Sequence, residues 1–125
     1  MTSVFVNRPR VLVVEFEKAI RDIVVYWVFS EGFDWREAEN GQAAIDLLAS
    51  GTRIDLVVSN FMFPEVDGLT LLSRVKKCYP HIPFAFLSSI ADAELALHAA
   101  RSGADAYLEL PCTGDDFRRM IRELV

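Results

Sequence analysis

The sequence contains little cysteine, no long uninterrupted apolar segment and no excess of basic residues. Cys78 and Cys112 are its only cysteines, and two cysteines at this separation form neither a metal-binding motif nor a disulfide framework. No apolar segment reaches the roughly 20 residues that a membrane-spanning helix needs, and residues 1–9 lack the apolar centre of a signal peptide. These absences predict a cytoplasmic protein that does not enter a membrane.

The charge balance is acidic, with 18 Asp and Glu residues against 13 Lys and Arg residues and a net charge of -5. This balance disfavours nucleic-acid binding, which requires a basic surface. A hydrophobic content of 52% and a charged content of 25% are typical of a folded domain. We expect a single domain over residues 1–125, in which residues 1–9 form an N-terminal leader segment.

Short apolar segments alternate with segments in which apolar residues recur at helical spacing. Continuous apolar strands indicate a parallel sheet that helices cover on both faces. Asn40 and Thr113 are placed to cap helices, and Gly32, Gly51 and Gly103 to end them. The pattern predicts an α/β fold with a doubly wound, five-stranded parallel sheet, (βα)5. Right-handed crossovers leave a few strand orders, and we expect the flavodoxin-like order 2-1-3-4-5, which is the commonest at this size. The predicted strands are residues 11–14, 33–38, 56–58, 84–87 and 106–108, and the helices include an Ala-rich one over 91–102.

The residues that follow the predicted strands are the candidate functional residues, because the carboxyl ends of parallel strands meet at one edge of the sheet. Asn60 lies just beyond the third strand, and Pro64 and Asp67-Gly68 then break the chain before the next helix. The other residues at this edge are Glu15, Phe16, Glu17, Ser88, Ser89, Leu110 and Pro111.

Several short motifs occur in a fixed order: Val11-Leu-Val-Val-Glu-Phe-Glu17, Asn40-Gly41, Asp55-Leu-Val-Val58, Met62-Phe-Pro-Glu-Val-Asp-Gly68, Leu87-Ser88, Gly103-Ala-Asp-Ala-Tyr107 and Leu108-Glu-Leu-Pro111. In order and spacing they resemble the receiver domain of bacterial two-component response regulators. The resemblance implies an aspartate at the end of the third strand that accepts a phosphoryl group. It also implies two acids that hold Mg²⁺, a hydroxyl after the fourth strand, and a lysine before the proline after the fifth.

Carried over position by position, much of this chemistry is replaced. Asn60 stands at the phospho-acceptor position, Phe16 replaces one metal-binding acid, and Leu110 replaces the lysine. Glu15, Ser88 and the switch aromatic Tyr107 remain. Joint replacement of charged partners by neutral groups is often tolerated, whereas loss of one partner alone is costly. The resemblance therefore implies a degenerate pseudo-receiver that is not an enzyme and has no catalytic residue at this site.

For the retained and replaced residues we expect limited chemistry. Glu15 is a weak candidate metal ligand, so no cofactor is expected and Mg²⁺ binding should be weak or absent. Phe16 is expected to fill the vacated pocket, whereas Tyr107 is equally consistent with a switch and with a static aromatic residue. For Asn60, the alternative is an ordinary residue that caps a turn.

The expected function is signalling through contacts with a kinase, an output domain or a partner regulator. A homodimer through the fourth helix, fifth strand and fifth helix is also consistent with the resemblance. Three alternatives stay open: phosphotransfer through another acceptor such as Ser88 or Glu15, a small-ligand sensor in the vacated pocket, and a purely structural dimerisation module.

Overall fold

A parallel β-sheet forms the centre of the computed structural model, which describes residues 8–61, 67–89 and 93–125. Within these ranges the sheet has five strands in the order β2-β1-β3-β4-β5, and every neighbouring pair is parallel. The predicted flavodoxin-like order is thus confirmed. The strands are β1 (Arg10–Val14), β2 (Asp34–Ala38), β3 (Leu56–Ser59), β4 (Phe84–Ser88) and β5 (Ala106–Glu109).

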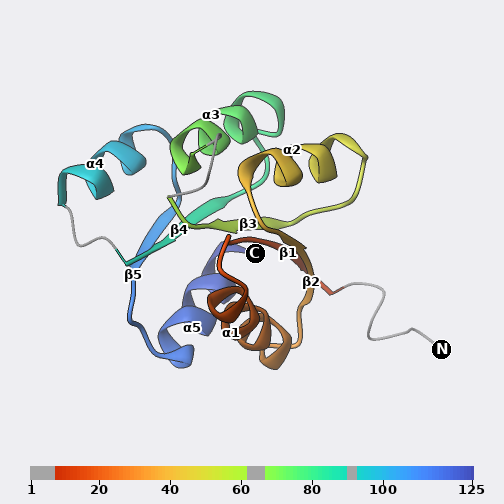
Figure 1. The fold of residues 1–125 in the computed structure, drawn as a ribbon, viewed down its shortest axis with the longest axis vertical. Helices are drawn as coiled ribbons and strands as arrows, with labels where there is room; N and C mark the ends of the chain where they lie inside the picture. Colours follow the sequence, from red (N-terminus) through yellow and green to blue (C-terminus); the bar gives the residue numbers. More distant parts are fainter. Residues whose placement is uncertain (1–7, 62–66, 90–92) are drawn as a thin grey trace.

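Helices cover both faces of the sheet. Figure 1 shows α1 and α5 on one face and α2, α3 and α4 on the other, as right-handed crossovers between parallel strands require. The helices are α1 (Lys18–Ser30), α2 (Gly41–Ala49), α3 (Gly68–Cys78), α4 (Ala93–Arg101) and α5 (Gly114–Leu124). Of the Ala-rich helix predicted over 91–102, residues 91 and 92 lie outside the described part, as does most of the leader segment.

The predicted helix caps are confirmed. The Asn40 side chain accepts a hydrogen bond from the backbone N–H of Ala43, and the Thr113 hydroxyl accepts one from Asp116. The Asp67 carboxylate caps α3 in the same way, by accepting from Thr70. Such caps satisfy backbone donors that a helix leaves unpaired at its start.

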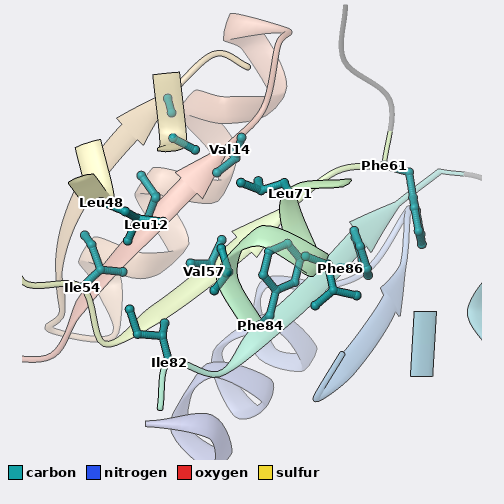
Figure 2. Packing of buried hydrophobic residues seen from close by; sticks show 14 of the residues in the cluster. Leu12, Val14, Leu48, Ile54, Val57, Phe61, Leu71, Ile82, Phe84 and Phe86 are labelled. Carbon is teal, nitrogen blue, oxygen red and sulfur yellow. The ribbon is translucent and has the colours of Figure 1, made fainter. Parts of the chain in front are cut away.

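Two apolar layers, one on each face of the sheet, form the core. Leu12, Val57 and Phe84 face the layer beneath α2, α3 and α4 (Figure 2), whereas Val11 and Val13 face the layer beneath α1 and α5. This burial of alternate residues on opposite faces explains why β1 is apolar throughout. The central strands are consequently held on both faces, which fixes the positions of their carboxyl ends.

Backbone hydrogen bonds continue past the strands and hold the next residues at one edge of the sheet. The N–H of Glu15 donates to the carbonyl of Ala38, and the N–H of Asn60 donates to that of Val14. At the ends of β4 and β5, the N–H of Leu110 donates to the carbonyl of Ser88 at 2.7 Å. The topology therefore brings these strand-end residues to the edge at which sequence analysis placed the candidate site.

Candidate functional site

The centre of the site is a direct contact between Glu15 and Asn60. Glu15 is only 5% exposed, and its carboxylate oxygens accept from Asn60 Nδ2 at 3.0 and 3.3 Å. One of these oxygens also accepts from the backbone N–H of Phe16 at 2.8 Å. A carboxylate removed from water needs such donors to remain charged. Here the donors are neutral amide groups from the ends of β1 and β3.

The Asn60 amide is engaged at both ends, which fixes its orientation. While Nδ2 donates to Glu15, Oδ1 accepts from the backbone N–H of Phe61 at 2.6 Å. A flipped amide would place its oxygen against the carboxylate and its NH₂ group against an N–H donor. Asn60 therefore acts as a hydrogen-bond donor to the buried acid, a role that an ionised aspartate cannot perform.

Arg21 on α1 stabilises the same edge of the sheet through the Glu15 backbone and the Glu37 side chain, and it does not bind the Glu15 carboxylate. Its Nη1 donates to the backbone carbonyl of Glu15 at 2.8 Å, and its Nε lies 3.1 Å from a carboxylate oxygen of Glu37. No sequence motif marked this residue, because its partners are Glu15, which follows β1, and Glu37 in β2. Within the described residues, the Glu15 carboxylate is thus stabilised by hydrogen bonds and has no cationic partner.

The expectation that Phe16 fills the vacated pocket is wrong. The Phe16 side chain is 54% exposed, whereas its backbone N–H is tied to Glu15. The described residues around Glu15 and Asn60 enclose a cavity of only about 10 Å³, which is barely enough for one water molecule. This cavity, which Glu15 and Asn60 line among the described residues, has no space for an aromatic ring.

Leu110 lies beside a different, apolar pocket of about 400 Å³ between α1 and the segment after β5. Ile23 and Trp27 line this pocket from α1, and Pro111 and Cys112 line it with Leu110. Burial raises the pKa of the Cys112 thiol, and the nearby Asp116 carboxylate raises it further. The thiol is therefore protonated at neutral pH, which agrees with a packing role and not with a nucleophilic one.

The hydroxyl and aromatic positions lie deeper in the sheet. Ser88 is fully buried at the end of β4. Tyr107 is half-buried in β5, with its ring centroid 5.4 Å from that of Phe61. Phe61 in turn stacks on Phe86 at 3.9 Å. An aromatic series thus connects β5 with the residue that follows Asn60.

The donor groups of this site do not fit Mg²⁺, the ion that the resemblance implies. Mg²⁺ requires near-octahedral oxygen coordination and usually binds through carboxylates. The described site supplies one carboxylate, Phe16 supplies no side-chain oxygen, and the Asn60 amide turns its NH₂ group toward Glu15. The described residues contain no cluster of three or more His, Cys, Asp or Glu side chains suited to a metal. The motif residues 62–66 lie outside the described part.

Comparison with known proteins identifies the family. The model of the response regulator receiver domain matches residues 11–122. The crystal structure of the NtrX receiver domain from Brucella abortus has a TM-score of 0.86 at 29% identity and covers 91% of this chain and 96% of that one. A signal receiver domain from Pseudomonas fluorescens Pf-5 has a TM-score of 0.88 at 28% identity, with 94% of each chain covered. The chain belongs to the response regulator receiver domain family.

Curated relatives are longer proteins. The chain is 32% identical over 116 residues to the sensor kinase CckA of Brucella abortus, covering 92% of this chain and 12% of that protein. It is 29% identical over 119 residues to the DNA-binding transcriptional regulator NtrC of Escherichia coli, covering 95% of this chain and 25% of that protein. Receiver domains act in two-component signalling, where they interact with kinases and output domains. In the described part, no helix is both long and apolar enough to cross a membrane.

Proposed function

We propose that this chain is a pseudo-receiver, which signals through protein contacts without accepting a phosphoryl group at the usual position. The observation that carries this proposal is the hydrogen bond from Asn60 Nδ2 to the buried carboxylate of Glu15. An amide is not a useful nucleophile toward phosphorus, and its oxygen is occupied by the N–H of Phe61. The domain accordingly needs no cofactor, and its Mg²⁺ affinity is weak.

The replacements also form an electrostatically consistent set. An aspartate at position 60 would stand beside Glu15 and would require Mg²⁺ or a lysine to offset the repulsion between the two carboxylates. With Asn60, Phe16 and Leu110 in place, one buried charge remains, and neutral donors satisfy it. The site is stable in a charge-poor state without ligand or modification.

Two alternatives fit the geometry less well. Ser88 is fully buried and Glu15 is 5% exposed, so neither is accessible to a phosphoryl donor as an alternative acceptor. A small-ligand sensor needs a pocket of about 300 Å³ or more. The cavity of about 10 Å³ beside Glu15 and Asn60 is too small, so such a ligand would have to use the separate apolar pocket of about 400 Å³ beside Leu110.

The proposed partners are other signalling proteins of the cytoplasm: a kinase, an output domain or a partner regulator. The resemblance also supports a homodimer through α4, β5 and α5. Direct nucleic-acid binding is not part of the proposal, because the net charge of -5 opposes it. A partner that binds one conformation more tightly would shift the domain toward that state.

The direct test is intact-mass measurement after incubation with acetyl phosphate and Mg²⁺, and separately with a histidine kinase. We expect the mass to stay unchanged, because no accessible carboxylate occupies the acceptor position. A stable adduct of one phosphoryl group that maps to the strand-end site would refute the proposal. A phosphorylatable receiver domain treated in parallel provides the positive control.

A second experiment asks whether the acceptor alone limits the chemistry. The Asn60→Asp variant should remain a poor phospho-acceptor, because Phe16 provides no metal-binding oxygen and Leu110 no cation for the phosphoryl oxygens. Restoring all three positions, through N60D, F16D and L110K together, should give markedly more Mg²⁺-dependent labelling than N60D alone. Strong labelling of the single variant would show that positions 16 and 110 matter less than we argue.

A further inference from the structure

Most lysines and arginines of this chain form ion pairs with carboxylates, but some do not within the described part of the chain. Nine of them form ion pairs with described carboxylates. Three others, Arg74, Lys77 and Arg101, have no ion pair or hydrogen bond within the described residues. In an acidic chain with 18 carboxylates, three unpaired cations are a feature that needs an explanation.

Arg74 and Lys77 line the groove between α3 and α4, and Arg101 lines a hollow that adjoins it. Thr70, Ser73, Arg74 and Lys77 follow helical spacing and therefore form one stripe on α3. Together with Asp67, Leu69, His98 and Ser102 they line a groove of about 670 Å³. Arg101 lines an adjoining hollow of about 500 Å³, which shares His98 and Ser102 with the groove.

The two helices adjoin at their carboxyl ends. A Cβ atom built on Gly103, just after α4, would lie 3.4 Å from Cγ of Lys76 on α3, and Figure 1 shows the two helices on the same face of the sheet. Lys76 itself is neutralised by Asp105 at 2.8 Å. The unpaired charge at this end of the groove therefore comes from Arg74, Lys77 and Arg101.

The helix dipole explains only part of this arrangement. Lys77 and Arg101 lie in the last turns of α3 and α4, where a cation stabilises the helix. Lys76 already provides that stabilisation to α3, and the dipole does not require cations of two helices to line adjoining hollows. Two acids also line this region from the amino-terminal ends of the helices: Asp67 lines the groove and Glu94 the adjoining hollow. The Asp67 carboxylate caps α3 by accepting from Thr70, so the cations at the carboxyl-terminal ends remain unpaired within the described residues.

We infer that the α3–α4 groove binds an acidic segment of a partner protein. Two or three carboxylates in an extended peptide match the three unpaired cations, and the hydroxyls of Thr70, Ser73 and Ser102 supply further hydrogen bonds. A small ligand would need deeper enclosure, and nucleic acid would need more cations than an acidic chain offers here. The inference does not depend on the state of Asn60, which lies outside the groove.

The test is an NMR titration of the ¹⁵N-labelled full chain with an end-capped hexaglutamate peptide at low salt. We expect chemical-shift changes at the carboxyl-terminal halves of α3 and α4. The R74Q/K77Q variant should weaken binding by about threefold to tenfold, since exposed ion pairs contribute modestly. Raising the ionic strength should weaken binding of the original chain in the same direction.

The matched control is K18Q/R119Q, which removes the same net charge from exposed positions on α1 and α5. This variant should bind hexaglutamate within about twofold of the original chain, because screened charges at other faces contribute little. Equal weakening in both variants, or shifts centred outside the groove, would overturn the inference. So would binding of tripolyphosphate or single-stranded DNA in the groove under conditions in which hexaglutamate does not bind.

Discussion

Replacing Asn60 by aspartate should destabilise the fold by about 2 kcal/mol at neutral pH and low ionic strength. The substitution removes the donor that lies 3.0 Å from the Glu15 carboxylate and puts a second carboxylate in its place. Glu15 is only 5% exposed, so its carboxylate cannot reach water unless the side chain leaves its buried position. Urea unfolding of N60D and of the original chain at neutral pH measures the effect.

A second substitution separates repulsion from the mere loss of a hydrogen bond. In the double variant E15Q/N60D, the amide and the carboxylate exchange positions. The new amide at position 15 can then donate to the new carboxylate at position 60, while the amide oxygen still accepts from the N–H of Phe16. We expect this variant to recover most of the lost stability. The Asn60→Ala variant, which adds no charge, should be less destabilised than N60D. If E15Q/N60D were no more stable than N60D, electrostatic repulsion would not explain the role of the asparagine.

The fold could be predicted from the sequence because its signals are local and repeated. The apolar run of β1 is buried on both faces, and its position in the sheet follows from the alternation of strands and helices. The caps Asn40 and Thr113 were predictable for the same reason, because a cap acts on backbone groups three residues away. Strand ends in a parallel sheet share an edge, so the sequence also predicts that Glu15 and Asn60 lie close together.

The side-chain contacts at this edge of the sheet are harder to predict from the sequence. Phe16 was expected inside because a vacated site suggests empty volume, but the cavity that Asn60 and Glu15 line among the described residues has no space for its ring. Arg21 was missed because one partner, Glu15, follows β1 and the other, Glu37, lies in β2. The first outcome depends on the contact between Glu15 and Asn60, which lie 45 residues apart, and the second on the position of Glu37, 16 residues from Arg21. Residue patterns do not carry such distances.

Gly68→Ala should be among the most destabilising single substitutions, at a cost of about 3 kcal/mol. A Cβ atom at this position would lie 2.5 Å from the carbonyl oxygen of Asn60, 2.8 Å from Cα of Phe61 and 2.9 Å from Cε1 of Phe86. Two of these three contacts are with backbone, which a rotamer change cannot relieve. The Phe86 ring is held by its stack on Phe61 and by the surrounding core (Figure 2). Denaturant unfolding of G68A against the original chain measures the loss.

Gly114→Ala provides a matched comparison, because Gly114 also occupies the first residue of a helix. The close contacts of its added Cβ would be with side-chain atoms alone, at 2.7 and 2.9 Å from the Trp27 indole and 2.9 Å from Nη1 of Arg118. Movement of side chains, without displacement of backbone, can therefore relieve them. Without a clash, alanine would stabilise either position by restricting the unfolded chain, so the sign of the effect is itself informative. A loss in G68A no greater than that in G114A would contradict the close approach of α3 to Asn60.

If the approach is as described, G68A must displace the Asn60 backbone. The NMR signals of the Asn60 side-chain NH₂ group should then shift, since its hydrogen bond to Glu15 depends on that backbone position.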